Sequence, residues 1–153
     1  MKRSSLAIAL CALATLVLTS LAPAQPGPRP QQKKRVMAVG MTEGFYHDST
    51  TEALATIKEL GDESGLWETY IYTDIHAITK LKQTANKKNL EQFDAIFFMT
   101  TGELPFTDEQ KASFLSFIKD DGKGFVGAHC ATDTFYKWPE YGEMLGGYFD
   151  QHP

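Results

Sequence analysis

Short apolar runs recur along the chain, and segments with helical spacing separate most of them. Apolar residues recur three or four positions apart after Ser49 and after Thr107, as on one face of an amphipathic helix. Strands that alternate with helices of this length predict an α/β fold with a parallel sheet and right-handed crossovers. The predicted strands cover residues 35–40, 66–72, 94–99 and 124–127.

The helix ends carry local signals. Ser49-x-x-Glu52 and Thr107-x-x-Gln110 match the capping box, which satisfies free amides of a first helical turn. Gly61 is expected to end the first helix. The lysine-rich segment 78–92 predicts one or two short surface helices, and residues 139–145 predict a last one.

This element order is typical of a flavodoxin-like doubly wound sheet with the strand order 2-1-3-4. We expect at least four strands. The chain ends soon after the last predicted helix, which leaves the fourth strand at an exposed edge. We therefore expect an incomplete, C-terminally truncated domain.

The amino terminus differs from the rest of the chain. A basic start, an apolar run over residues 6–21 and Ala22-Pro23-Ala24 are typical of a secretory signal peptide. The run is short for a membrane span, which needs about 20 apolar residues. We therefore expect a secreted or periplasmic protein that does not span the membrane. Its predicted parts are a signal peptide (1–24), a disordered leader (25–33) and one domain (34–153).

Charge and cysteine content narrow the possible functions. The chain carries 15 Lys and Arg against 19 Asp and Glu, a net charge of −4, and it has no basic stripe. A nucleic-acid partner is therefore not expected. After removal of the signal peptide only Cys130 remains, so the mature chain cannot form an internal disulfide.

Polar residues gather directly after three of the predicted strands. Parallel strands end at the same edge of a sheet, and open α/β sheets bind ligands just beyond that edge. Clusters far apart in sequence should therefore meet in space. These clusters cover residues 42–48, 100–103 and 129–133.

We expect the chemistry to centre on His129, which ends the last apolar run. A histidine there needs a partner, and Asp133, His47 or Glu103 can orient it for acid–base work. Two alternatives remain open. His47 and Asp48 can instead cap the following helix, and Glu103 can be a solvated loop residue.

The same edge offers ligands for a metal and for a substrate. The imidazoles of His47, His129 and His152 could hold a divalent ion such as Zn, although no two of them have a local metal-binding spacing. Aromatic rings there could stack on a sugar ring, or could instead pack in the core. The predicted substrate-binding residues are Tyr46, Thr101, Thr132 and Trp138.

Cys130 lies at a strand-to-helix turn where a strained elbow can present a nucleophile. Thr132 stands where such an elbow has a small residue, and strand alternation turns the side chain of His129 to the opposite face. Free cysteine is also among the most buried residue types. A buried, unreactive Cys130 is therefore favoured over a nucleophile.

Four motifs follow one another along the chain: Gly44-Phe45-Tyr46-His47-Asp48-Ser49, the run 124–134, Trp138-Pro139-x-Tyr141 and the run 146–153. Together they resemble the ThuA-like (trehalose utilisation) family over residues 34–153. The resemblance implies a class I glutamine amidotransferase-like fold and carbohydrate catabolism, with keto-sugars as candidate substrates. It also implies that His47, His129, Asp133 and His152 share one pocket. The amidotransferase triad would need a histidine and a glutamate from a later strand, which the chain lacks.

Three functions remain open at this stage. The leading one is an exported sugar-processing domain, either a hydrolase or a lyase, that binds a small-molecule carbohydrate. The second is a non-catalytic carbohydrate-binding accessory module with the same pocket. The third, less favoured, is a cysteine-dependent amidotransferase or hydrolase.

Overall fold

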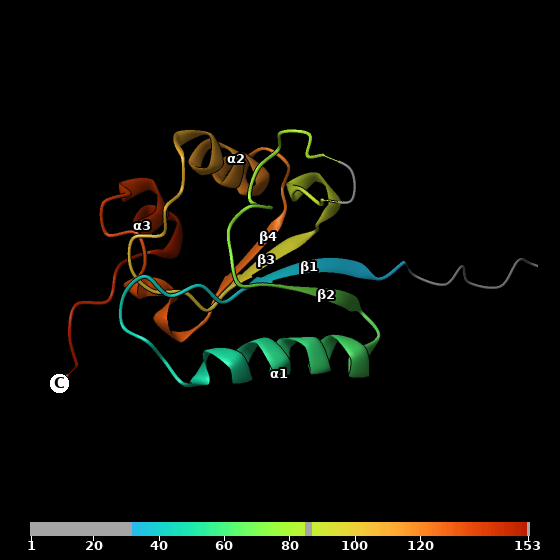
Figure 1. The fold of residues 1–153 in the computed structure, drawn as a ribbon, viewed down its shortest axis with the longest axis horizontal. Helices are drawn as coiled ribbons and strands as arrows, with labels where there is room; N and C mark the ends of the chain where they lie inside the picture. The colour runs from blue at the N-terminus through green and yellow to red at the C-terminus, as the bar shows by residue number, and fades with distance from the viewer. Residues whose placement is uncertain (1–31, 85–86, 153) are drawn as a thin grey trace, which may run out of the picture. The chain divides into compact units, whose positions relative to one another are not determined.

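A computed structural model describes residues 32–84 and 87–152. The predicted signal peptide (1–24) lies outside the described residues. Within them, parallel strands form one sheet in the order β2-β1-β3-β4 (Figure 1), which confirms the predicted α/β fold and strand order. The strands are β1 (Lys34–Val39), β2 (Trp67–Tyr72), β3 (Ala95–Phe98) and β4 (Gly124–Gly127).

Helices cover both faces of this sheet. Helix α1 (Ser49–Ser64) lies against one face, and α2 (Asp108–Lys119) and α3 (Pro139–Leu145) lie on the other (Figure 1). Two single-turn 3₁₀ helices, η1 (Leu90–Gln92) and η2 (His129–Asp133), precede β3 and follow β4.

The alternation of side chains along β1 divides the core into two clusters. Ala38 belongs to the cluster beneath α1, which includes Leu54 of that helix. Met37 and Val39 point the other way, into a larger cluster with Phe114 of α2. Because both faces are covered, the middle of the sheet is apolar throughout. In the two central strands, β1 and β3, polar side chains are therefore confined to the strand ends.

The ends of α1 differ from the sequence prediction. Asp48 is the N-cap residue and already has helical dihedral angles, so Ser49 lies inside the first turn and the predicted capping box does not form. The helix also continues past Gly61 to Ser64, and Gly65 ends it in the left-handed conformation (φ 67°). By contrast, the predicted capping box at Thr107 and Gln110 is present at the start of α2.

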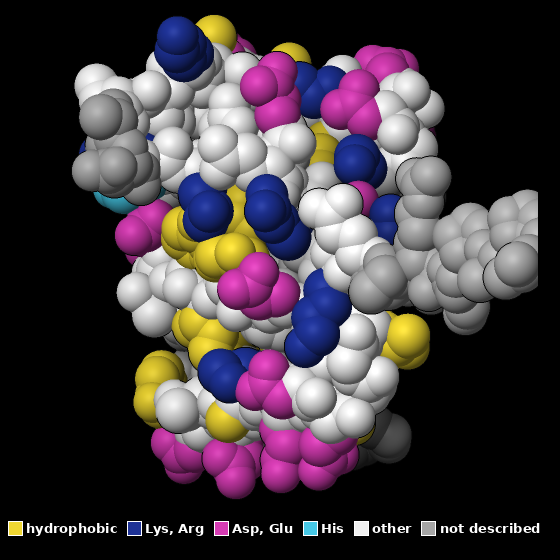
Figure 2. All heavy atoms as spheres, turned by 90° about the vertical axis from the view of Figure 1, so that its right-hand side faces the viewer, with side chains coloured by type: hydrophobic (Ala, Val, Ile, Leu, Met, Phe, Trp, Pro, Cys, Tyr) yellow, Lys and Arg dark blue, Asp and Glu magenta, His cyan; other side chains and the backbone are white. Residues whose placement is uncertain are grey.

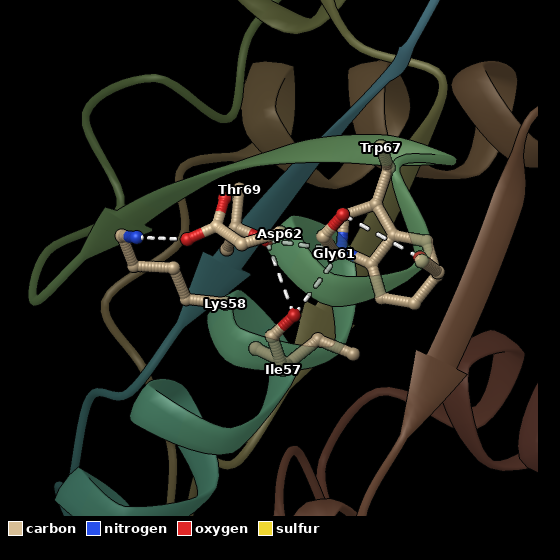
Figure 3. Close-up of polar contacts among 7 residues, drawn as sticks. Ile57, Lys58, Gly61, Asp62, Trp67 and Thr69 are labelled. Atoms are coloured by element: carbon tan, nitrogen blue, oxygen red, sulfur yellow. Dashed lines mark hydrogen bonds and ion pairs between the residues drawn. The ribbon is translucent and has the colours of Figure 1, made fainter.

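Gly61 lies within α1 because of a tertiary contact. A Cβ at this position would lie 2.5 Å from the indole nitrogen of Trp67, so only glycine leaves room for the ring. The indole N–H of Trp67 donates to Ile57 O (3.2 Å) and to Thr69 Oγ1 (3.0 Å) (Figure 3). Trp67 thus fixes the return from α1 into β2.

The segment 78–92 is not one or two surface helices. Apart from residues 85–86, which are not described, it contains only the single turn η1. Ile78 and Leu90 are fully buried, and Asn89 Nδ2 donates to the carbonyl oxygens of Lys80 (3.3 Å) and Leu81 (3.2 Å). The segment is an irregular loop that covers the core. Hydrogen bonds from the Asn89 side-chain amide take the place of the backbone hydrogen bonds that a helix would make here.

The amino ends of the strands carry charges of both signs. Figure 2 views the side on which β1 begins and shows basic and acidic side chains interspersed. Asp94 pairs there with Lys34 (3.2 Å) and Lys123 (3.3 Å). The backbone N–H of Arg35, followed by these lysines, lowers the pKa of the Asp94 carboxyl. The positive and negative charges at the amino ends of the strands therefore largely neutralise one another.

Strand β4 forms one edge of the sheet, as expected. Its Val126 side chain is 55% exposed. In the described part of the chain, we find no helix with the length and apolar character that crossing a membrane requires.

Candidate functional site

A pocket of about 440 Å³ opens at the carboxyl ends of the strands. We call it the central pocket. Three segments far apart in sequence form it: the loop after β1, the turn after β4, and the C-terminal residues that follow α3. Its lining residues are Phe45, His47, His129, Cys130, Thr132, Asp133, Phe149 and His152.

His129 occupies a strained turn directly after β4. Its backbone has φ 45°, a left-handed conformation that costs an L-residue roughly 1–2 kcal/mol. The turn is tight, since a Cβ on Gly127 would lie 2.9 Å from the Cβ of Ala131. Small residues thus flank His129 two positions before and two positions after. This is the arrangement of a nucleophile elbow, with an imidazole at its centre.

The position of the elbow corrects the sequence prediction. The sequence places a candidate elbow at Cys130, weakened by Thr132 in the position of the small residue, but the strained residue is His129 and the small residue two positions later is Ala131. Strand alternation also does not apply here, because the backbone already turns into η2 at His129. The side-chain direction of His129 is therefore set by the turn and not by the strand.

His47 lies edge-on against His129. Their ring centroids are 4.8 Å apart with planes at 89°, and Phe45 packs against His47 on the same loop (5.0 Å). The Nδ1 atom of His47 is buried and has no hydrogen-bond partner among the described residues. A buried nitrogen without a partner is costly. The two imidazoles thus form a pair at one wall of the central pocket.

The loop that carries His47 is held firmly at the strand ends. Glu43 N donates to Thr101 O (2.9 Å) and Thr101 Oγ1 donates to Phe45 O (2.9 Å). Gly102 (φ 80°) approaches so closely that a Cβ there would lie 2.5 Å from Glu43 C. Thr101, predicted to bind substrate, is buried and instead positions this loop.

Asp133 does not orient His129 by a hydrogen bond in this structure. Its Oδ1 accepts from the hydroxyl of Tyr136 (2.7 Å), which also lies 2.9 Å from Phe149 O. Burial, followed by the bond to Asp133, raises the pKa of Tyr136 to about 12. Phe149 N donates to Thr132 O (3.0 Å), so the C-terminal residues are fastened to η2. The pocket wall formed by Phe149 and His152 depends on these bonds.

Cys130 is poorly suited to nucleophilic attack. Its side chain is buried, and its Sγ lies 3.7 Å from Met99 Sδ. Burial raises the pKa of the thiol, and the negative charge of Asp133 adds to the effect. The thiolate, which is the reactive form, is therefore disfavoured. This geometry argues against a cysteine-dependent reaction.

Four predicted site residues do not line the central pocket: Thr101, described above, and Glu103, Trp138 and Tyr46. Glu103 accepts from the backbone N–H of Lys137 (3.0 Å) and points to a different loop. Trp138 is buried and packs on Phe135 (5.1 Å between centroids), which does not favour its predicted substrate-binding role. Tyr46 is exposed and lines a neighbouring pocket.

The predicted metal set is not supported. His47, His129 and His152 line the same pocket, yet in the part of the chain that the structure describes, no group of three His, Cys, Asp or Glu side chains could hold a metal ion. The imidazoles of His47 and His129 meet edge to face instead of converging on one point. We therefore assign no step to a metal.

Phe149 was not singled out as a site residue from the sequence. It contacts the ring of His152 (4.9 Å between centroids) and lines the central pocket together with Phe45. One feature of the sequence could have pointed to Phe149, namely its place between Gly146-Gly147 and His152. The two glycines have positive φ (90° and 159°), which lets the chain turn back over η2.

Comparisons with known proteins agree with this architecture. The model of the ThuA family, described as trehalose utilisation, matches residues 35–153. A crystal structure of a ThuA-like protein from Parabacteroides merdae superposes with a TM-score of 0.59 at 16% sequence identity. The match covers 79% of this chain and 41% of that one, so the chain spans about two fifths of its structural relative. No curated protein matches the chain.

Proposed function

The chain belongs to the ThuA (trehalose utilisation) family, and on that premise we propose that it processes a sugar in the central pocket, with His129 and His47 as an acid–base pair. The single observation that carries the proposal is the strained left-handed backbone of His129, whose ring packs against that of His47; the buried Nδ1 of His47 has no hydrogen-bond partner among the described residues. Strain of this kind is retained where it holds a functional group in place.

The pocket suits a sugar ring on physical grounds. Its volume lies in the range of small-molecule sites, roughly 300–1,000 Å³. Phe45 and Phe149 supply apolar ring faces for the C–H face of a sugar, while Thr132 and Asp133 supply hydrogen-bonding oxygens. In hydrolysis or elimination, a neutral imidazole takes a proton from water or from a carbon beside a carbonyl. The protonated partner gives a proton to the leaving oxygen.

The test uses the full chain and three histidine variants. Wild-type protein, His129→Ala, His47→Ala and His76→Ala are incubated with trehalose and with a 3-keto disaccharide, and products are followed by NMR. His76 is exposed in another loop and lies outside the central pocket, so it is the matched control. Loss of a general acid or base lowers turnover by about 10²–10⁴-fold. We expect that loss for His129→Ala and His47→Ala, and no change for His76→Ala.

The same experiment separates the alternatives. Turnover by His129→Ala at the wild-type rate overturns the acid–base assignment. Sugar binding without turnover by the wild-type protein favours the accessory binding module. Absence of both binding and turnover overturns the proposed sugar function.

We also propose that residues 1–24 direct export. The supporting observation is the order of a basic start, an apolar run and Ala22-Pro23-Ala24. Amino-terminal sequencing of the protein recovered from the producing cells tests it. A mature chain that begins at Gln25 is the expected result, and an intact Met1 in the exported fraction refutes it.

A further inference from the structure

A second pocket of about 410 Å³ lies beside the central pocket. We call it the threonine pocket. It forms where β1 ends and α1 begins, and Thr73 after β2 completes it. Of the residues that line this pocket, only Tyr46 is predicted from the sequence to bind substrate. The side chains that give it its chemistry are Thr42, Glu43, Tyr46, Thr50, Thr51 and Thr73.

The two pockets share one wall, the loop of residues 43–47. Phe45 and His47 line the central pocket, whereas Glu43 and Tyr46 line the threonine pocket. The bonds from this loop to Thr101 hold the wall in place. A ligand long enough to cross it would contact both pockets at once.

The groups in the threonine pocket favour a neutral, hydroxyl-rich ligand. Threonine hydroxyls both donate and accept hydrogen bonds, and the Glu43 carboxylate accepts them. Among the described residues, no Lys, Arg or His lines the pocket, and Glu43 gives it a negative charge that disfavours an anion. The ring of Tyr46 is 65% exposed and offers a face for stacking.

Thr50 adds an independent sign of an unmet polar contact. Its side chain is 8% exposed, and its Oγ1 has no hydrogen-bond partner among the described residues. A buried hydroxyl without a partner is costly. Thr50 lines the threonine pocket, but its Oγ1 is itself covered, so a ligand reaches this hydroxyl only if the side chain rotates.

We propose that the threonine pocket binds the second ring of a disaccharide whose first ring occupies the central pocket. This rests on the proposed sugar function and extends it to the length of the substrate. The 43–47 loop then lies beneath the glycosidic linkage, with His47 on one side and Tyr46 on the other. Affinity for a disaccharide should exceed affinity for either ring alone.

Calorimetric titration of the full chain with trehalose and with glucose tests this inference. The variants are Thr51→Val, Thr73→Val and Tyr46→Ala, with Tyr46→Trp to restore a stacking ring. The matched control is Thr56→Val, since Thr56 is exposed on the same helix but lies outside both pockets. Loss of one good contact is expected to weaken trehalose binding by about tenfold. Glucose binding, Thr56→Val and Tyr46→Trp should remain near wild type.

Each outcome decides the matter. Unchanged trehalose affinity in Thr51→Val, Thr73→Val and Tyr46→Ala overturns the second-ring site while sugar binding to the wild type stands. Equal weakening of glucose and trehalose also overturns it, because the pocket would then not be specific for a second ring. If wild-type protein binds neither sugar, the proposed function fails and this inference fails with it.

Discussion

The strained turn at His129 makes a quantitative prediction about stability. A left-handed backbone costs an L-residue about 1–2 kcal/mol, a cost that glycine avoids. Against this, glycine loses about 0.4–1 kcal/mol more conformational entropy on folding than alanine. With φ 45° at His129, we therefore expect His129→Gly to be more stable than His129→Ala by about 0.5–1 kcal/mol.

An ordinary helical position should give the opposite order. Glu59 is exposed within α1, where glycine is about 1 kcal/mol less favourable than alanine. The pair Glu59→Gly and Glu59→Ala therefore controls for the intrinsic difference between the two residues. The reversal of sign between positions 129 and 59 is the diagnostic result.

Urea unfolding followed by tryptophan fluorescence measures all four variants. The free energies of unfolding should differ at constant m-value, because none of the substitutions changes the surface that unfolding exposes. The expected difference at position 129 shifts the melting temperature by about 2–4 °C. If glycine is the less stable residue at both positions, the backbone of His129 is not strained and the elbow assignment fails.

Three further outcomes follow from the same contacts. Cys130 should resist iodoacetamide at pH 8, because burial raises the thiol pKa; rapid alkylation seen by mass spectrometry would contradict its burial. Gly102→Ala should lower the free energy of unfolding, measured in urea, by more than about 2 kcal/mol, because φ at this position is 80° and the new Cβ meets the backbone of Glu43. An unchanged free energy of unfolding would show that Gly102 does not hold the 43–47 loop in place. Tyr136 has its pKa raised from 10.0 to about 12, so its protonated form stabilises the fold below pH 10, and that contribution is lost as pH rises through 12. Wild type should therefore lose more stability than Tyr136→Phe between pH 10 and 12; parallel curves would refute the bond to Asp133.

The sequence alone predicted the strands and their order. Parallel strands covered on both faces must be apolar along their length, so runs such as 94–99 are recognisable without any tertiary information. The capping box at Thr107 is equally local, because its bonds link residues three positions apart. The convergence of polar clusters at one sheet edge then follows from topology.

Helix boundaries that depend on distant contacts were not predictable in the same way. Gly61 is usually a stop signal, yet it lies within α1 because the indole of Trp67 occupies the space of a side chain. Trp138 looked available for a sugar ring, but the cluster around Phe114 buries it. An aromatic residue near a strand end has no local mark that separates a core side chain from a stacking one.

The sequence by itself therefore determined the fold and the sheet edge at which chemistry is expected. The tertiary structure decided which side chains reach the central pocket. Strand alternation ceases to hold once the backbone turns into η2, and the close approach of Gly127 to Ala131 forms that turn. The turn places His129, and not Cys130, at the centre of the elbow, and the loop pinned to Thr101 places His47 against it. The turn at His129 is local, but the placement of His47 against it arises from contacts between segments far apart in the chain, which no local pattern encodes.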